Sequence, residues 1–96
     1  MKTTYLTLIT YTDQGIKNLK ASPQRAAAWR KEAEAAGVKV IAQLWLTGKY
    51  DGALLLESDS EAKIFSELTR LTAAGNVRTR SLRSFDVNEF AALVGG

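Results

Sequence analysis

Thr47-Gly48-Lys49-Tyr50-Asp51-Gly52 is the stretch that decides the fold, because it separates two apolar runs that are typical of β-strands. We expect these strands over residues 38–47 and 52–57. The connection between them is short, so the two strands are predicted to form an antiparallel hairpin. The same turn presents the phenol of Tyr50 beside the carboxylate of Asp51, which makes it the first candidate for a functional site.

Two further strands and two long helices are predicted on either side of this hairpin. The strands are expected over 3–11 and 77–85, where apolar and β-branched residues alternate with polar ones. Ser22 is the predicted N-cap of the first helix, which has Pro23 in its first turn. Gly37 ends that helix as the expected left-handed residue.

The second long helix is expected over about 59–74, where Ser58 and Glu61 have the spacing of a capping box. Asp86 and Glu89 repeat this spacing ahead of a short terminal helix. The order is therefore β-α-β-β-α-β plus a tail helix, which is the ferredoxin-like split arrangement. The connection lengths fit a four-stranded antiparallel sheet with both long helices on one face, in a single α+β domain made of all 96 residues.

The helices and the sheet are predicted to share one core, with Trp29 and Phe65 as aromatic members. The opposite face of the sheet is also expected to be apolar, because strict alternation along the strands puts these residues on it: Tyr5, Ile9, Tyr11, Ile41 and Trp45. Such a face needs cover, and no second layer remains in the chain. A second copy of the chain is the natural cover, so we expect a homodimer or a higher oligomer.

The composition excludes several classes of functional site. The chain contains no cysteine and no histidine, so disulfides, thiolate nucleophiles, the usual zinc sites and His-ligated haem are ruled out within it. A metal site built from Asp13, Asp51 and Glu57 would suit only hard cations, and their spacing does not resemble an EF-hand loop. The glycines stand at turns and not in a phosphate-binding run. We therefore expect neither a metal nor a cofactor.

Charge and hydropathy bear on the partners and the compartment. The net charge of +3 arises from 13 basic and 10 acidic residues along the chain, and only Arg78, Arg80 and Arg83 cluster. Such sparse basic charge does not predict a nucleic-acid partner. No apolar run is long enough to span a membrane, and residues 1–10 lack the apolar segment of a signal peptide. The expectation is a soluble, cytoplasmic protein without a membrane partner.

Several motifs stand out along the chain: the segment 11–18, Ser22-Pro23 at a helix start, Gly48-Lys49-Tyr50-Asp51, and Gly75-Asn76-Val77-Arg78-Thr79. Together they resemble the GYD domain family. The family takes its name from a glycine-tyrosine-aspartate turn, and in this chain Lys49 stands between Gly48 and Tyr50. The resemblance implies the architecture of the dimeric α/β-barrel superfamily, in which two ferredoxin-like sheets pack face to face. Members of that superfamily include cofactor-independent oxygenases, isomerases, haem enzymes and ligand-sensing domains, so the resemblance does not select an activity.

The candidate catalytic residues are Tyr50, Asp51 and Tyr11. A carboxylate at Asp51 can accept a proton, and the phenol of Tyr50 can donate a hydrogen bond to a substrate carbonyl. In the structural alternative, Gly48 and Gly52 supply backbone angles that are closed to other residues, and Asp51 only bonds local N–H groups. Both interpretations of the turn stay open at this point.

The candidate ligand-binding residues are Tyr5, Thr7, Tyr11, Trp45, Tyr50, Asp51 and Arg78. Their aromatic members and Thr7 either line a mostly apolar pocket between the sheet and a partner subunit or pack a dimer interface. Alternation puts Arg78 and Arg80 on one face, where they can hold an anion, protect an edge strand or form salt bridges. Arg83 is out of phase with them unless a bulge intervenes. The segment 11–18 is either a lid over the pocket or a capped turn.

Three functions follow from these observations. The first is an oligomeric module that binds a small molecule between the sheet and a partner subunit. The second is a cofactor-independent isomerase or monooxygenase that acts on a small aromatic or enolisable substrate, and it needs a carboxylate or phenol with a shifted pKa because the chain has no histidine. The third is a structural or assembly protein whose apolar face serves only subunit contacts.

Overall fold

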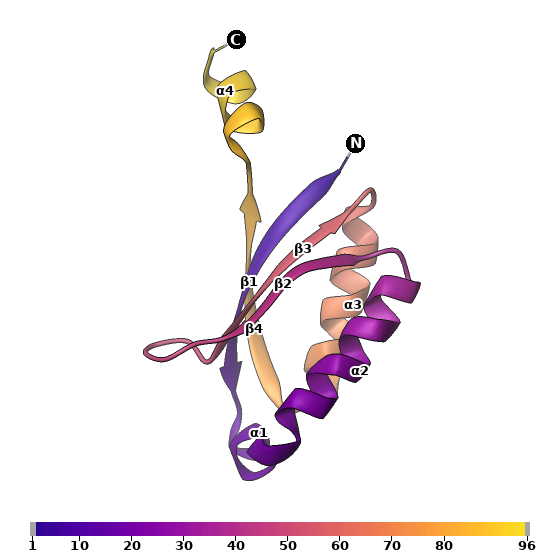
Figure 1. Ribbon diagram of the computed structural model, residues 1–96, viewed down its shortest axis with the longest axis vertical. Helices are drawn as coiled ribbons and strands as arrows, with labels where there is room; N and C mark the ends of the chain where they lie inside the picture. Colours follow the sequence, from indigo (N-terminus) through magenta and orange to yellow (C-terminus); the bar gives the residue numbers. More distant parts are fainter. Residues whose placement is uncertain (1, 96) are drawn as a thin grey trace.

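The computed structural model describes residues 2–95, and its elements follow the predicted order (Figure 1). The strands are β1 (Thr3–Tyr11), β2 (Lys39–Trp45), β3 (Gly52–Ser58) and β4 (Val77–Ser84). The helices are α1 (Asp13–Lys17), the short 3₁₀ helix η1 (Leu19–Ala21), α2 (Ser22–Ala35), α3 (Glu61–Ala73) and α4 (Val87–Gly95). The predicted hairpin is formed by β2 and β3.

The strands form one four-stranded antiparallel sheet in the order β2-β3-β1-β4. Figure 1 shows α2 and α3 on the same side of this sheet. The predicted α+β, ferredoxin-like arrangement is therefore confirmed. The helix α4 follows the edge strand β4 and projects away from the sheet and from the two long helices (Figure 1).

The core lies between the sheet and the two long helices. Its most deeply buried aliphatic side chains are Val38, Val40, Leu54, Leu56 and Ile64. The predicted core position of Trp29 is confirmed, because its side chain is buried and its indole N–H donates to the carbonyl oxygen of Glu67 at 3.0 Å. The core position predicted for Phe65 is wrong, since this residue is 51% exposed. Its neighbours Ile64 and Leu68 supply the buried side of α3 instead.

The side of β1 that the sequence predicted to be uncovered is the side that faces the helices. Tyr5 belongs to the core cluster, and the hydroxyl of Tyr11 is hydrogen-bonded to that of Ser22 on α2. Tyr5, Ile9 and Tyr11 therefore lie on the helix side together with Thr7, and not on the uncovered side. One side of β1 combines aromatic and aliphatic residues with a threonine and the other combines leucines with threonines, so alternation alone does not show which side is covered.

The strand β2 changes phase within its length. Its register with β3 shifts between Val40 and Ala42, which makes Ile41 the extra residue of a β-bulge. As a result, Val40 and Trp45 lie on the same side of the sheet, although strict alternation predicts opposite sides. Neither glycine nor proline marks the bulge in the sequence.

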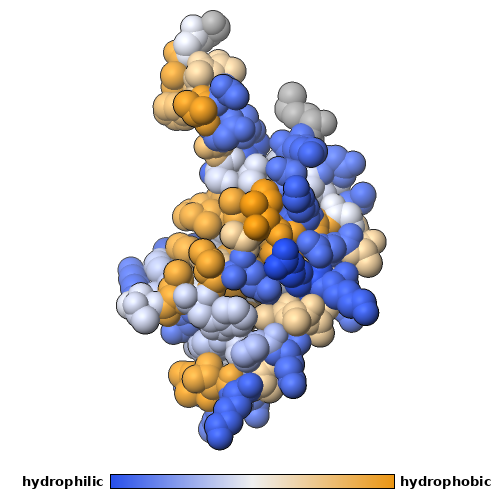
Figure 2. Space-filling model, in the orientation of Figure 1, coloured by the Kyte–Doolittle hydropathy of each residue, from blue (hydrophilic) through white to orange (hydrophobic). Residues whose placement is uncertain are grey.

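The other side of the sheet, which we call the open face, is not covered by any helix of residues 2–95. Cross-strand pairing places these aliphatic residues on it: Leu6, Leu8, Ala42, Leu44, Leu55 and Leu82. Leu44 is 56% exposed and Leu82 is 46% exposed. Figure 2 shows apolar side chains over the strands, away from the two long helices, and again on α4. An uncovered apolar face is thus present, but it is made of leucines and not of the predicted tyrosines and tryptophan.

The ends of the helices agree with the sequence in part. Ser60, and not Ser58, caps α3 by accepting the backbone N–H three residues further on. The Ser58 hydroxyl instead donates to the carbonyl oxygen of Gly37 at 2.9 Å, which ties the end of β3 to the turn after α2. The capping box of α4 is confirmed: the N–H of Asp86 donates to the Glu89 carboxylate at 3.0 Å, and the Glu89 N–H donates to the Asp86 carboxylate at 2.8 Å.

Candidate functional site

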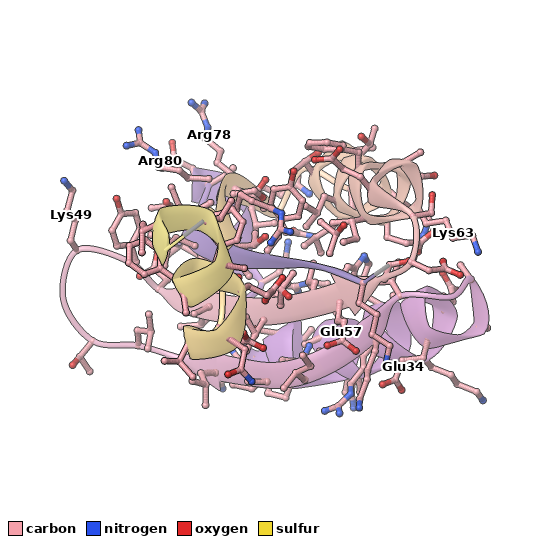
Figure 3. The ribbon with its side chains drawn as sticks, turned by 90° about the horizontal axis from the view of Figure 1, so that it is seen from above. Glu34, Lys49, Glu57, Lys63, Arg78 and Arg80 are labelled. Atoms are coloured by element: carbon pink, nitrogen blue, oxygen red, sulfur yellow. The ribbon has the colours of Figure 1, made fainter. Side chains whose placement is uncertain are left out.

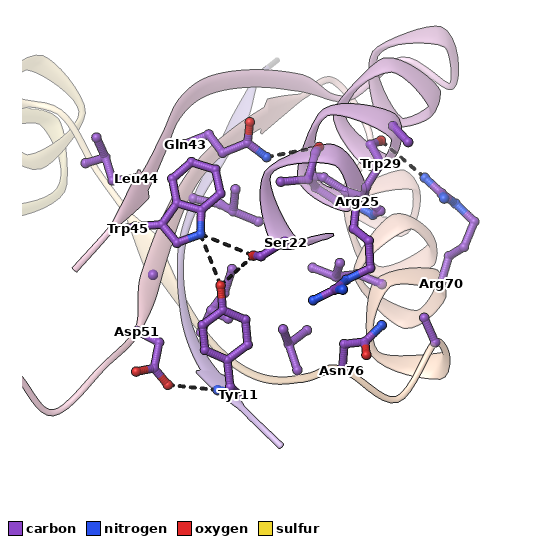
Figure 4. A pocket seen from close by; sticks show the side chains of 18 of the residues that line it. Tyr11, Ser22, Arg25, Trp29, Gln43, Leu44, Trp45, Asp51, Arg70 and Asn76 are labelled. Atoms are coloured by element: carbon purple, nitrogen blue, oxygen red, sulfur yellow. Dashed lines mark hydrogen bonds between the residues drawn. The ribbon is translucent and has the colours of Figure 1, made fainter. Parts of the chain in front are cut away.

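A cavity of about 310 Å³ lies between the helix side of the sheet and the two long helices (Figure 4). It is bordered by the ends of β1 and β2, the starts of β3 and β4, one side of α2 and the last turn of α3. This volume is near the lower end of the range for small-molecule sites, which are typically about 300–1,000 Å³. The sequence predicted a pocket between the sheet and a partner subunit, whereas this cavity lies inside one chain.

Tyr11, Ser22 and Trp45 form a hydrogen-bonded cluster at the cavity (Figure 4). The hydroxyl oxygens of Tyr11 and Ser22 are 2.5 Å apart. The indole N–H of Trp45 donates to the oxygen of Tyr11 at 3.1 Å and to that of Ser22 at 3.3 Å. Two of the predicted ligand-binding residues, Tyr11 and Trp45, are thus brought together at one cavity, and their role in ligand binding stays a prediction.

Ser22 lines the cavity, although the sequence predicted it only as a helix cap. The N-cap of α2 is Ala21, and among residues 2–95 no side chain caps this helix. The helix begins at Ser22 itself because η1 runs directly into it. The Ser22 hydroxyl is therefore free to bond Tyr11 and Trp45. A serine before Pro23 has the same sequence signature in both roles, so no signal reveals this one.

Asp51 fixes the hairpin turn to the end of β1. Its carboxylate accepts the backbone N–H of Tyr11 at 2.8 Å, and its own N–H donates to the carbonyl oxygen of Ile9 at 2.8 Å. Its carbonyl oxygen accepts the N–H of Leu46 at 2.9 Å. Asp51 also lines the cavity. Asp51 therefore bonds local N–H groups, as the structural alternative predicts, and it also borders the cavity. Its role in catalysis or ligand binding stays a prediction.

Replacing Asp51 by alanine is expected to lower the free energy of unfolding by about 1–2 kcal/mol, because the Tyr11 N–H loses a charged acceptor. Asp51→Asn keeps an acceptor oxygen and should lose about half as much. Urea denaturation followed by tryptophan fluorescence measures both. The control is Glu57→Ala, which removes the ion pair to the exposed Lys2 (3.4 Å) and should cost about 1 kcal/mol or less. Equal losses in the two alanine variants would contradict this role for Asp51.

Tyr50 does not join Asp51 at the cavity. It is half-buried, is not one of the lining residues, and has the ammonium of Lys49 5.8 Å from its ring centroid. The turn needs glycine at one of the two predicted positions for its backbone angle, because Gly48 has a φ of 110° and Gly52 has no positive φ. At Gly52 the constraint is space, since an added Cβ would lie 3.0 Å from the carbonyl oxygen of Leu44.

Two arginines line the cavity, and they differ in their ionic partners. Arg70 lies 2.6 Å from the carboxylate of Glu67 and 2.5 Å from that of Glu32. Arg25 donates to the backbone oxygen of Asn18 at 2.8 Å. Within residues 2–95, Arg25 forms no ion pair with a carboxylate. The sequence did not single out Arg25, because nothing in a helical arginine shows that it lines a cavity.

The remaining predicted ligand-binding residues lie elsewhere. Tyr5 and Thr7 are buried on the helix side but do not line the cavity; Tyr5 donates to the Glu61 carboxylate, and the Thr7 and Ser81 hydroxyls are 2.9 Å apart. Arg78 is exposed on the open face, where it stands opposite Thr10 of β1.

The arginines of β4 occupy two faces, as alternation predicts. Figure 3 shows Arg78 and Arg80 projecting together on the same side. Arg83 lies on the helix side without any bulge in β4, since its strand keeps one register with β1. Its guanidinium donates to the carbonyl oxygen of Thr4 at 3.2 Å and lies 4.4 Å from the ring centroid of Phe85. Arg83 therefore holds the end of the sheet and does not contribute to the cavity.

The segment 11–18, predicted as a lid or a capped turn, contains α1 and is bound to the turn after α3. The backbone N–H of Thr12 donates to the carbonyl oxygen of Asn76 at 3.1 Å, and its hydroxyl donates to that of Gly75 at 2.6 Å. The Thr12 hydroxyl also accepts the N–H of Gly15 and so caps α1. These contacts favour the capped turn.

The described part of the chain contains neither a group of metal-binding side chains nor a helix that could span a membrane. Between residues 2 and 95, no group of three or more histidine, cysteine, aspartate or glutamate side chains is arranged to hold a metal ion. None of the helices in this range combines the length and the apolar composition that crossing a membrane requires.

Two comparisons with known proteins address the family. The family model of the GYD domain matches residues 5–94. A protein of Thermus thermophilus named glutamine synthetase and cystathionine beta-lyase binding protein is 31% identical over 90 residues, which cover 93% of this chain and 95% of that relative. Both matches extend over nearly the whole chain and include the hairpin turn and the residues around the cavity. The chain therefore belongs to the GYD domain family.

Proposed function

We propose that the protein is a self-associating binding protein that holds a small molecule in the cavity beside Tyr11, Ser22 and Trp45. One observation carries this proposal: a largely apolar cavity brings a preformed polar cluster and a cation, Arg25, together inside one chain. Ligand sites in proteins combine apolar walls with a few fixed polar groups in this way. Because the three residues of the cluster hold one another, little order is lost when a ligand binds.

The isomerase or monooxygenase alternative has weaker support. Of its candidate residues, Tyr50 is not at the cavity, Asp51 uses one carboxylate oxygen to accept the Tyr11 N–H, and the Tyr11 hydroxyl is hydrogen-bonded to Ser22. Binding requires neither an acid nor a base, so it is the function that this geometry favours.

Small-molecule binding is tested by a screen of metabolites that differ in charge and shape against the purified protein. A ligand is expected to raise Tm and to move the indole N–H resonance of Trp45 in a ¹H–¹⁵N NMR spectrum. The amide resonance of Ala91 on α4, which is not a lining residue, serves as the reference. If no compound stabilises the protein or moves the Trp45 resonance, small-molecule binding is refuted.

Self-association is proposed for the open face, with a second copy of the chain as its cover. The leucines there are only partly buried within one chain, and fully burying a leucine side chain is worth about 1.5–3 kcal/mol. Neither long helix can cover them, because both pack on the other side of the sheet (Figure 1). A matching face of a second copy would bury both sets of leucines at once.

Replacing Leu82 by glutamate is expected to shift the protein to the monomer, because a carboxylate is costly to bury in an apolar interface and Leu82, unlike Leu44, does not line the cavity. Sedimentation velocity over a range of concentrations measures the shift. The matched control is Ile16→Glu, which places the same charge at a 59% exposed residue of α1 and should leave association unchanged. An unsubstituted protein that stays monomeric at all concentrations would refute self-association.

Protein partners are a second candidate function, favoured by the name of the Thermus thermophilus relative. That relative is named for binding glutamine synthetase and cystathionine beta-lyase. We propose that this chain also binds an enzyme of this kind. Biolayer interferometry with glutamine synthetase and cystathionine beta-lyase from the organism of this protein tests the proposal. Saturable binding of either enzyme would support it, and no binding of either enzyme would refute it.

A further inference from the structure

We propose that the small molecule held in the cavity is an organic carboxylate with a flat apolar body, and that Arg25 binds its carboxylate. This inference rests on the proposed function, because it names the class of ligand for the same cavity. It depends on three features of the described residues: the unused donors of Arg25, the balanced charge of Arg70, and the apolar side chains around them.

Most guanidinium N–H donors of Arg25 are not hydrogen-bonded within the described residues. It lies three residues after Ser22 and four before Trp29 on α2, so all three side chains emerge on one side of the helix. A guanidinium carries five N–H donors, and the one hydrogen bond that Arg25 makes within residues 2–95 goes to the backbone oxygen of Asn18. Figure 4 shows its guanidinium turned toward the amide of Asn76, inside the ring of lining residues.

The other charges at the cavity leave Arg25 without an ionic partner. Arg70 is bound by the carboxylates of Glu32 and Glu67. Asp51 lies across Tyr11 from Arg25 in Figure 4, and it accepts the Tyr11 N–H. A half-buried guanidinium without a counter-ion is unfavourable, and a bound anion would offset that cost. A single cation matches a carboxylate of charge −1 better than a phosphate of nearly twice that charge.

The rest of the ligand is expected to be apolar. Ile9, Trp29, Leu54, Leu71 and Val77 supply much of the remaining lining. The hydroxyls and the indole N–H of the polar cluster already bond one another, so they do not demand a polar ligand group. Trp45 adds an aromatic surface beside these side chains, and flat rings pack well on such surfaces.

The test uses three compounds with the same ring and a different end group: phenylacetate, phenylacetamide and phenethylamine. Each is titrated into the full-length protein and followed by the Trp45 indole N–H and the Arg25 side-chain N–H resonances. Phenylacetate is expected to bind at least about tenfold more tightly than the amide, in line with a charged hydrogen bond, and the amine to bind least. Arg25→Gln should abolish this preference.

The matched control is Lys31→Gln, which removes one positive charge from the exposed side of the same helix and should leave the preference intact. Well-dispersed spectra of both variants show that they are folded. Equal binding of the three compounds, an unchanged preference in Arg25→Gln, or no binding of phenylacetate would each overturn the ligand class. The proposed function has its own test: it is refuted if no compound of any chemical class binds in the metabolite screen.

Discussion

Replacing Gly15 by alanine is expected to lower the free energy of unfolding by about 3 kcal/mol, the largest loss that we expect from a single methyl group in this chain. A Cβ at this position would overlap with the backbone oxygen of Asn76 and lie 3.0 Å from Cδ1 of Tyr11. The oxygen belongs to backbone that is itself hydrogen-bonded to Thr12, so it cannot move aside cheaply. The substitution must therefore separate α1 from the turn before β4.

Two other glycines provide the controls for this measurement. Gly48→Ala tests backbone strain alone, because its φ is 110° and no atom lies within 4 Å of an added Cβ, so it should cost about 1–2 kcal/mol. Gly95→Ala, which has neither constraint, should change nothing measurable. Thermal and urea unfolding give the three losses, and about 3 kcal/mol corresponds to a fall in Tm of well over 10 °C for a domain of this size. A loss at Gly15 no larger than that at Gly48 would contradict the overlap.

The fold was predictable because its signals are local and repeated. The hairpin between two apolar runs, the Pro23 helix start, the glycines at 37 and 75, and the Asp86–Glu89 capping box each specify one boundary. Together they leave few topologies other than the ferredoxin-like one. The boundaries that differ, such as the cap at Ser60 in place of Ser58, move by only two residues because both serines precede the same helix.

The faces of the sheet were less predictable than its topology. Strand alternation shows which residues share a side of the sheet but not which side faces the helices. The extra residue at Ile41 exchanges the two sides for the rest of β2. In β1, Tyr5 and Tyr11 look as suitable for an outer aromatic face as for a core. What decides is long-range packing: Tyr5 enters the core cluster and Tyr11 reaches Ser22 on α2. Neither contact has a signature within its own strand.

The cavity was predictable in its residue types and not in its position. Tyr11, Trp45 and Asp51 were singled out for their chemistry, and all three border the cavity. Ser22 and Arg25 were not, since their spacing on α2 matters only once the helix is placed on the sheet. The same placement separates two proposed functions in space, because the ligand cavity lies on the helix side and the proposed interface lies on the open face.

Replacing Arg70 by methionine is expected to lower the free energy of unfolding by about 3 kcal/mol. The variant keeps most of the apolar stem but removes the charge that Glu67 and Glu32 share. Glu67 is 8% exposed, so its carboxylate would stay buried without the counter-ion that Arg70 supplies. The guanidinium also donates to the backbone oxygen of Trp29 at 3.4 Å, and this bond is lost with it. Chemical denaturation measures the loss.

The double variant Glu67→Gln/Arg70→Met distinguishes the loss of charge balance from the loss of packing. Glutamine at 67 carries no charge, so the double variant should be more stable than Arg70→Met alone, although it holds one more substitution. Lys63→Met breaks a largely exposed ion pair, whose Lys63–Asp59 distance is 3.7 Å, and should cost about 1 kcal/mol or less. Additive losses in the double variant would mean that the loss in Arg70→Met does not come from the uncompensated charge of Glu67.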